Sequence, residues 1–184
     1  MPKDPPRLSR SLPDTPAAAP VRIVHLGVGN FHRAHQAWYT AHSPDADEWG
    51  IAAFTGRGTG MADALAPQDG LYTLITRSAQ GDTFELVGAL SAVHAAADHD
   101  RYLDYLSRPE LALVTITVTE AGYLRGADGH LDADRQVIRS DLEALRSDHR
   151  NLVASLPARL VAGLMTRLVV AETVWLLLLS RAIA

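Results

Sequence analysis

The feature that most restricts the fold of this chain is a Gly-Val-Gly turn between a predicted strand and a predicted helix. The β-branched run Val21–Leu26 predicts a short strand, and residues 31–41 contain neither Gly nor Pro and predict a helix. Gly27 and Gly29 lie between them, the order that a dinucleotide-binding turn requires. In such a turn the first glycine permits the tight bend, and the second lets the backbone approach a pyrophosphate.

The rest of the chain alternates strand and helix patterns. The run 111–118 lacks polar alternation, which predicts a strand buried on both faces in the middle of a parallel sheet. Segments 71–76 and 83–90 predict two paired strands around a Gln-Gly-Asp turn. Together these patterns predict an α/β, doubly wound, mostly parallel Rossmann-like sheet with an antiparallel hairpin addition. The remaining predicted elements are a strand at 49–54 and helices at 61–65, 98–106, 132–145 (capped by Asp132) and 157–164 (opened by Pro157).

Composition excludes several classes of protein. The chain of 184 residues contains no cysteine, which removes disulfides, thiolate nucleophiles and iron–sulfur clusters. Its 17 basic and 21 acidic side chains give a net charge of −4, unlike a nucleic-acid-binding protein. The apolar run 168–179 contains Glu172 and is shorter than the about twenty residues that a membrane span needs. We expect neither a nucleic-acid partner nor a membrane.

The first twenty residues contain six prolines and three consecutive alanines. So many prolines exclude a helix, and the few apolar groups do not offset the entropy of ordering the chain. We therefore expect residues 1–20 to form a disordered Pro/Ala-rich arm. Because the arm has no apolar signal-peptide core, the chain is expected to be cytoplasmic.

Three ordered motifs across residues 22–164 resemble the mannitol dehydrogenase family of polyol-specific long-chain dehydrogenases. They are Val-His-Leu-Gly-Val-Gly-Asn-Phe-His-Arg-Ala-His-Gln at 24–36, Gln-Asp-Gly-Leu-Tyr-Thr-Leu at 68–74, and Val-Thr-Glu-Ala-Gly-Tyr at 118–123. The resemblance implies metal-independent, NAD- or NADP-linked interconversion of a polyol or hexonate and its ketose or keto-uronate. The implied partner is therefore a small-molecule polyol or ketose.

The resemblance and the turn together predict the cofactor site. Gly27, Gly29, Asn30 and Phe31 surround the pyrophosphate turn. Arg33 either adds positive charge beside it or is a solvated helix residue.

After the second strand, an NAD enzyme usually places an acid on the ribose hydroxyls, but this chain has Thr-Gly-Arg-Gly-Thr at 55–59. Arg57 either pairs with a 2′-phosphate or is an exposed loop residue, so the choice between NAD and NADP stays open.

The carboxyl end of the predicted strand 111–118 supplies the candidate reaction centre. Ligands of open α/β sheets bind beyond these strand ends, which adds Thr117 and Thr119 to the cofactor site. Glu120 is the candidate catalytic residue, as a pocket-shaping or proton-relaying group, and the alternative is a glutamate that caps the turn. The resembling enzymes carry a catalytic lysine in a second, helical domain, and here the only lysine is Lys3.

Four histidines fall in one part of the sequence, His25, His32, His35 and His42. A zinc site needs three or four converging ligands, whereas only His32 and His35 share a helix face. We expect His25 to point elsewhere from its strand and His32 and His35 to make packing or polar contacts under the turn. The prediction is therefore that there is no metal site.

The predicted domain organisation is an arm at 1–20, an NAD(P)-binding Rossmann domain at 21–164 and an atypical apolar tail at 165–184. After residue 164 the sequence stops resembling the family, so we expect a truncated product that lacks the polyol domain. The face that this domain would cover predicts self-association. Two functions stay open: a polyol or hexuronate dehydrogenase, and a catalytically inactive dinucleotide-binding module or partner-dependent redox sensor.

Overall fold

A computed structural model describes residues 7–155 and 158–166 of the chain. The chain divides into two compact units, Met1–Ala97 with Ala112–Thr117, and Asp98–Leu111 with Val118–Ala184. The predicted helix start at Pro157 and the apolar run 168–179 lie outside the described residues.

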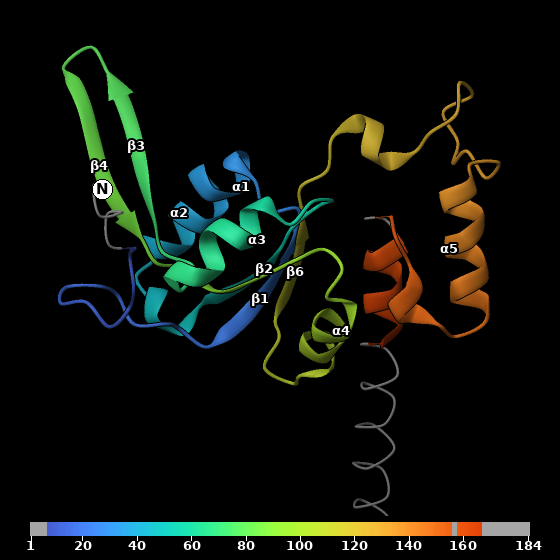
Figure 1. Cartoon of the computed structure of the whole chain (residues 1–184), viewed down its shortest axis with the longest axis horizontal. Coiled ribbons are helices and arrows are strands. Elements are labelled where there is room, and N and C mark those ends of the chain that lie inside the picture. Colours follow the sequence, from blue (N-terminus) through green and yellow to red (C-terminus); the bar gives the residue numbers. More distant parts are fainter. Residues whose placement is uncertain (1–6, 156–157, 167–184) are drawn as a thin grey trace, which may run out of the picture. The chain divides into compact units, whose positions relative to one another are not determined.

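The first unit is built on a four-stranded parallel sheet (Figure 1). In spatial order its strands are β5 (Leu90–His94), β2 (Gly50–Phe54), β1 (Val21–Leu26) and β6 (Leu113–Ile116). β1 pairs in parallel with both β2 and β6, and β2 pairs in parallel with β5. The predicted α/β class with a mostly parallel sheet is confirmed.

Three short helices connect these strands: α1 (Asn30–Ala34), α2 (Gln36–Ala41) and α3 (Gly60–Leu65). Two single 3-10 turns, Ala46–Glu48 and Ala66–Gln68, complete the connections. The predicted single helix at 31–41 is wrong, because His35 leaves helical geometry at φ −122° and ψ −84°. The His35 ring stacks on Phe31 at this break, with centroids 4.3 Å apart.

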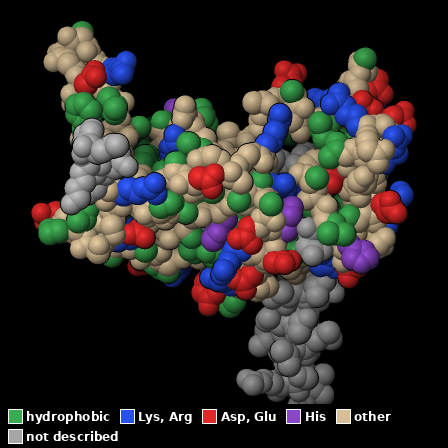
Figure 2. All heavy atoms as spheres, in the orientation of Figure 1, with side chains coloured by type: hydrophobic (Ala, Val, Ile, Leu, Met, Phe, Trp, Pro, Cys, Tyr) green, Lys and Arg blue, Asp and Glu red, His purple; other side chains and the backbone are tan. Residues whose placement is uncertain are grey.

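An antiparallel hairpin of β3 (Tyr72–Ser78) and β4 (Gly81–Val87) projects from the sheet (Figure 1). This confirms the predicted hairpin addition, but the predicted strand 83–90 is two strands. The first strand, β4, ends before Gly88, where an added Cβ would lie 2.3 Å from Pro16 Cγ. Leu90 then begins β5 in the parallel sheet. On the hairpin, Ile75 and Phe84 face each other and are 47% and 69% exposed. Figure 2 shows hydrophobic side chains at the surface in this region.

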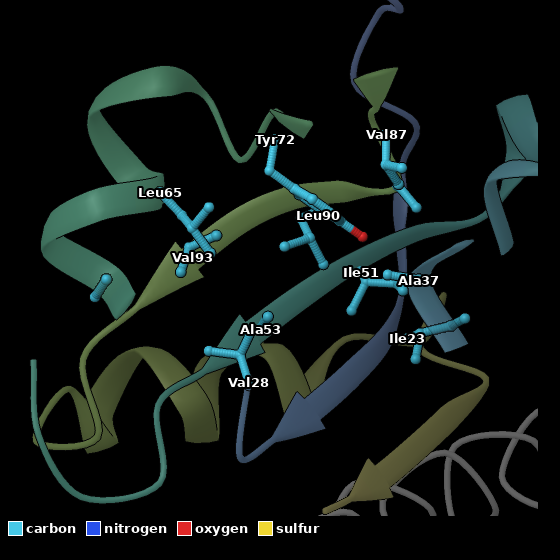
Figure 3. Close-up of a cluster of buried hydrophobic side chains, with 12 residues drawn as sticks. Ile23, Val28, Ala37, Ile51, Ala53, Leu65, Tyr72, Val87, Leu90 and Val93 are labelled. Atoms are coloured by element: carbon cyan, nitrogen blue, oxygen red, sulfur yellow. The ribbon is translucent and has the colours of Figure 1, made fainter. Parts of the chain in front are cut away.

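The core of the first unit lies between one face of the sheet and the helices α2 and α3 (Figure 3). Ile23, Ile51 and Val93 line this face, and Ala37 and Leu65 pack on it from the two helices. Every residue of β2 is buried, as in a strand covered on both faces.

The strand predicted to be central, 111–118, is shorter and differently placed. Within the described residues, β6 occupies an edge of the sheet, and Leu113 is 46% exposed. The prediction of a central position is therefore corrected, since apolar residues alone do not fix strand order.

The second unit is helical. Its elements are α4 (His99–Ser107), α5 (Gln136–Arg146), the 3-10 turns Glu120–Tyr123 and Arg150–Leu152, and a helical segment at 158–166. Asp132 does not cap α5, because the helix begins four residues later and the Asp132 carboxylate instead accepts from Arg135 Nε at 2.9 Å. The buried Asp141 accepts backbone N–H groups of Ala154 and Ser155, at 2.6 and 3.1 Å.

Residues 7–20 contain no helix or strand but make specific contacts with the first unit. Arg10 donates hydrogen bonds to the carbonyl oxygens of Gly88 and Leu90 at 2.8 and 3.0 Å. Its backbone N–H donates to the Asp69 carboxylate at 2.9 Å. Arg10 therefore joins the start of the chain to β5 and to the end of the second 3-10 turn.

Among the described helices, none combines the length and apolarity that crossing a membrane requires.

Candidate cofactor site

The glycine turn stands at the carboxyl end of β1, where the chain approaches two other strands. Gly27 and Val28 both donate their N–H groups to the Phe54 carbonyl at the end of β2, at 2.9 Å. Gly27 has φ +99°, and an added Cβ would lie 2.3 Å from the Thr117 carbonyl oxygen. Only glycine fits both the backbone angle and this distance. The tight bend predicted at Gly27 is what the structure shows.

The second glycine leaves open space over the turn. An added Cβ at Gly29 would meet only the Gly27 carbonyl oxygen, at an ordinary 3.7 Å. Gly29 precedes α1 and no side chain caps this helix start. Asn30 and Phe31 follow and are exposed, Phe31 by 65%. Backbone amides and two exposed side chains thus border an open position, and backbone N–H groups before a helix suit an anionic ligand.

A stacked pair of histidines lies under the turn. His32, at the usual third-glycine position, is 1% exposed, and its ring stacks on His25 with centroids 3.5 Å apart. Burial lowers the pKa of His25 to about 4, and burial, followed by the neighbouring His25, lowers the pKa of His32 to about 3. Both rings are therefore neutral near pH 7. The expectation that His25 points away from this helix is wrong, because its ring stacks on His32 of α1.

Polar contacts fix the His25 ring from β6. His25 Nδ1 lies 2.8 Å from Thr115 Oγ1, and Thr115 donates to Gln36 Oε1 at 3.0 Å. Since the Thr115 proton goes to Gln36, Nδ1–H of His25 is the donor to Thr115. Nε2 then accepts from Thr117 Oγ1 at 3.3 Å. The sequence reasoning missed Gln36 and Thr115, although the spacing of Thr115 and Thr117 already placed both on one face of a strand.

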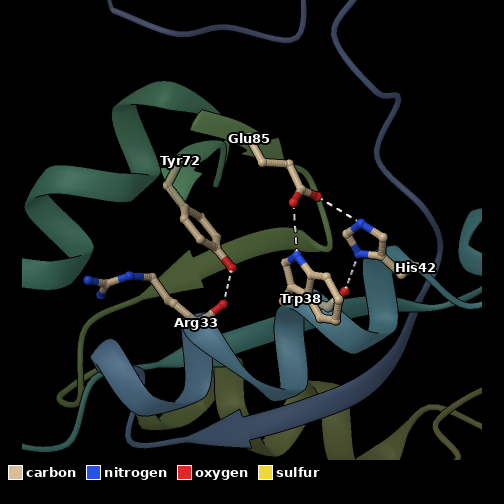
Figure 4. Close-up of polar contacts among 5 residues, drawn as sticks. All are labelled: Arg33, Trp38, His42, Tyr72 and Glu85. Carbon is tan, nitrogen blue, oxygen red and sulfur yellow. Dashed lines mark hydrogen bonds and ion pairs between the residues drawn. The ribbon is translucent and has the colours of Figure 1, made fainter. Parts of the chain in front are cut away.

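Arg33 is half-buried rather than solvated (Figure 4). Its guanidinium donates to Asn30 Oδ1 at 2.6 Å and to Met61 Sδ, and its carbonyl accepts from the Tyr72 hydroxyl at 2.7 Å. Burial lowers the pKa of Arg33, and Tyr72 acts in the opposite direction. The Arg33 side chain is thereby held between the first residues of α1 and of α3.

The other predicted site residues are more exposed. Arg57 lies in the exposed loop after β2. Thr117 is half-buried and comes directly after the last residue of β6. Thr119 and Glu120 belong to the second unit, where Thr119 precedes the 3-10 turn Glu120–Tyr123 without a side-chain cap. Glu120 is exposed. Within the described ranges, three or more His, Asp or Glu side chains nowhere gather as a metal site would need.

A parallel sheet with a glycine turn after its first strand defines the class of Rossmann dinucleotide-binding domains. This chain belongs to the mannitol dehydrogenase family, because the model of the mannitol dehydrogenase Rossmann domain matches residues 21–172.

Curated relatives agree with this assignment. D-mannonate oxidoreductase of Escherichia coli is 40% identical over 131 residues, which are 66% of this chain and 27% of the relative. Mannitol 2-dehydrogenase of Aspergillus fumigatus is 36% identical over 154 residues, 77% of this chain and 31% of the relative. The chain thus spans about a quarter to a third of the length of these relatives.

A solved structure shows the same fold. The substrate-free crystal structure of a D-sorbitol dehydrogenase superposes with a TM-score of 0.70 at 30% identity. The match covers 82% of this chain and 31% of the sorbitol dehydrogenase chain.

Proposed function

We propose that this chain is the NAD(P)-binding part of an oxidoreductase that interconverts a polyol or hexonate and its ketose or keto-uronate. The observation that carries the proposal is the turn at Gly27, whose φ of +99° and 2.3 Å approach to Thr117 only glycine tolerates. Family membership supplies the class of chemistry, and the named relatives act in mannitol and mannonate oxidation or the reverse.

The residues of the first unit fit a dinucleotide. Gly29 leaves the backbone open to a pyrophosphate, and Asn30 and Phe31 border that position. Arg33 supplies a cation near the start of α3, on the adenosine side of that position, where it is held by neutral partners. A bound nicotinamide dinucleotide would supply the hydride acceptor for oxidation of a secondary alcohol, and a base would be needed for the hydroxyl proton. Under this proposal the buried, neutral His25–His32 pair supports the turn from below without adding charge to it.

We also propose Glu120 and Thr119 as residues beside the reacting groups. Both follow β6 in the chain, and ligands of parallel sheets bind beyond the strand ends. Glu120 would orient the substrate carbinol or relay its proton. Replacing Glu120 with Gln keeps the size of the side chain and removes its charge, so it separates these roles from a merely structural one.

A second candidate is a dinucleotide-binding module without catalysis, which would sense the redox state of the cofactor or act with a partner. The 184 residues contain one lysine, Lys3, and the site described above contains none. A buried lysine with a lowered pKa is a suitable base for alcohol oxidation near neutral pH.

One pair of measurements separates the candidates. The purified chain is titrated with NADH and NADPH by fluorescence, then assayed with mannitol, fructose, mannonate and fructuronate. Turnover that falls in the Glu120→Gln variant supports the dehydrogenase, and tight nucleotide binding without turnover supports the binding module. Absence of nucleotide binding contradicts both.

We expect a cytoplasmic protein, and fractionation of cells that express the chain tests this.

A further inference from the structure

We infer that Arg33 recognises the 2′-phosphate of the cofactor, so that the site prefers NADP to NAD. The inference rests on the proposed function and concerns the adenosine end of the same site. It depends on where the Arg33 guanidinium is held and on the lack of an acid after β2.

The position of the guanidinium is fixed by its two partners. Asn30 is the first residue of α1, which follows the turn at the end of β1, and Met61 is the second residue of α3, which follows the loop at the end of β2. Arg33 therefore bridges the starts of the two helices that follow β1 and β2. In a Rossmann sheet the adenosine ribose lies beyond the end of the second strand, on this side of the pyrophosphate.

The charge of Arg33 is not balanced within the first unit. Its hydrogen-bond acceptors are a thioether and a carboxamide, and within the described residues no ion pair joins Arg33 to a carboxylate. Partial burial without an anionic partner carries a desolvation cost, which an anion bound beside the guanidinium would offset. A phosphate on the ribose would supply the missing anion and match the planar fork of donors.

The loop after β2 also favours NADP over NAD. A carboxylate there would hydrogen-bond the free hydroxyls of NAD and repel a 2′-phosphate. Residues 55–59 contain no Asp or Glu. Thr55 is buried and its Oγ1 accepts the Ala96 N–H at 2.7 Å, so its oxygen is engaged within the fold. Residues 55–59 thus offer no carboxylate to the ribose hydroxyls of NAD.

Arg33 and Arg57 differ in a way that an experiment can use. Arg57 is fully exposed on the loop, whereas Arg33 is oriented by Asn30, Met61 and the adjoining Tyr72 ring, 5.8 Å from its guanidinium carbon. An oriented guanidinium loses less side-chain entropy on binding a phosphate. We therefore assign the recognition to Arg33, and Arg57→Gln is the matched control for Arg33→Gln.

The test compares the dissociation constants of NADPH and NADH for the 184-residue chain, together with those of 2′,5′-ADP and 5′-AMP as fragment probes. We expect the unmodified chain to bind NADPH and 2′,5′-ADP at least about tenfold more tightly than NADH and 5′-AMP. Arg33→Gln should lower the affinity for NADPH about 10- to 100-fold and leave the affinity for NADH within about threefold. Arg57→Gln should leave the ratio of the two constants within about threefold.

A second variant covers the case in which Arg33→Gln fails to fold, which circular dichroism reports. An added Cβ at Gly58 meets nothing within 4 Å, so Gly58→Asp places a carboxylate in the loop without a clash. This variant should bind NADPH more weakly and should bind NADH with unchanged affinity.

Three results would overturn the inference and leave the proposed function standing: equal or tighter binding of NADH by the unmodified chain, an equal loss of both nucleotides in Arg33→Gln, or a ratio controlled by Arg57. Failure to bind either nucleotide overturns both.

Discussion

The imidazole ring of His25 lies flat against that of His32, with centroids 3.5 Å apart and planes 11° from parallel. One ring comes from β1 and the other from α1, and both are 1% exposed. The pair occupies the place where a Rossmann domain usually has its third glycine and its close helix–strand contact. Here two neutral aromatic rings fill that space, and one of them is oriented by Thr115 of β6 and by Thr117 just after it.

This pair should make the protein sensitive to acid. The folded-state pKa values of about 4 for His25 and about 3 for His32 lie below the ordinary value of 6.5. Between each folded-state value and pH 6.5, the unfolded chain therefore binds more protons than the folded chain. The contribution of this pair to the free energy of unfolding is therefore greatest above pH 6.5. It decreases as the pH drops toward 4, by about 3 kcal/mol for His25. Urea unfolding between pH 7 and pH 4.5 measures the slope.

The variant His32→Phe keeps a buried ring and removes one titrating group, so it should show a shallower dependence on pH than the unmodified chain. An unchanged slope in this variant would mean that other groups cause the loss in acid.

Gly27→Ala should destabilise the fold and abolish nucleotide binding. The substitution combines a positive φ with a clash against the Thr117 carbonyl oxygen, and each effect costs about 1–3 kcal/mol. Thermal unfolding and NADH titration report the two losses. Gly58→Ala is the matched control, since its Cβ has free space and its Tm should stay within a few degrees. Equal behaviour of the two variants would refute the role of Gly27.

Arg10→Ala should release the start of the chain from the first unit. Arg10 donates to the Pro16, Gly88 and Leu90 carbonyls, and burial, opposed by Asp69, lowers its pKa. Hydrogen–deuterium exchange of residues 8–20 should then rise toward the rate of an unstructured peptide. Arg7→Ala changes an exposed arginine three residues earlier and should leave exchange unaltered. Fast exchange already in the unmodified chain would instead support the predicted disordered arm.

Glu85 joins the hairpin to α2, and its removal should loosen the hairpin with little loss of global stability. It accepts from Trp38 Nε1 at 3.0 Å and pairs with His42 Nε2 at 2.8 Å (Figure 4). Because the ion pair is more than 40% exposed on both sides, it is worth at most about 1 kcal/mol.

Glu85→Ala is therefore expected to lower the free energy of unfolding by about 1 kcal/mol and to raise amide exchange in β3 and β4. The control is Asp82→Ala, which breaks only the longer Arg77 contact of 3.8 Å within the hairpin. A loss above about 3 kcal/mol would show that Glu85 supports the core as well.

Much of the fold follows from local patterns. The run Val21–Leu26, the glycines at 27 and 29 and the pairing of residues 72–87 are recognised because strand and turn chemistry acts over a few residues. The break at His35 and the division of the predicted strand at Gly88 escaped sequence reasoning. No Gly or Pro marks the break at His35, and the close approach of Gly88 to Pro16 joins segments that are distant in the sequence.

The sequence by itself determined that this chain forms an α/β dinucleotide-binding domain, because a strand, a Gly-x-Gly turn and a helix must follow one another in the chain. Its resemblance to the mannitol dehydrogenase family was carried by the motifs at 24–36, 68–74 and 118–123. Only the tertiary structure decided that His25 stacks on His32, that β6 lies at an edge within the described residues, and that Arg33 bridges the starts of the helices that follow β1 and β2. These relationships join residues that the order of strands in the sheet brings together, and strand order is set by global packing rather than by any local pattern.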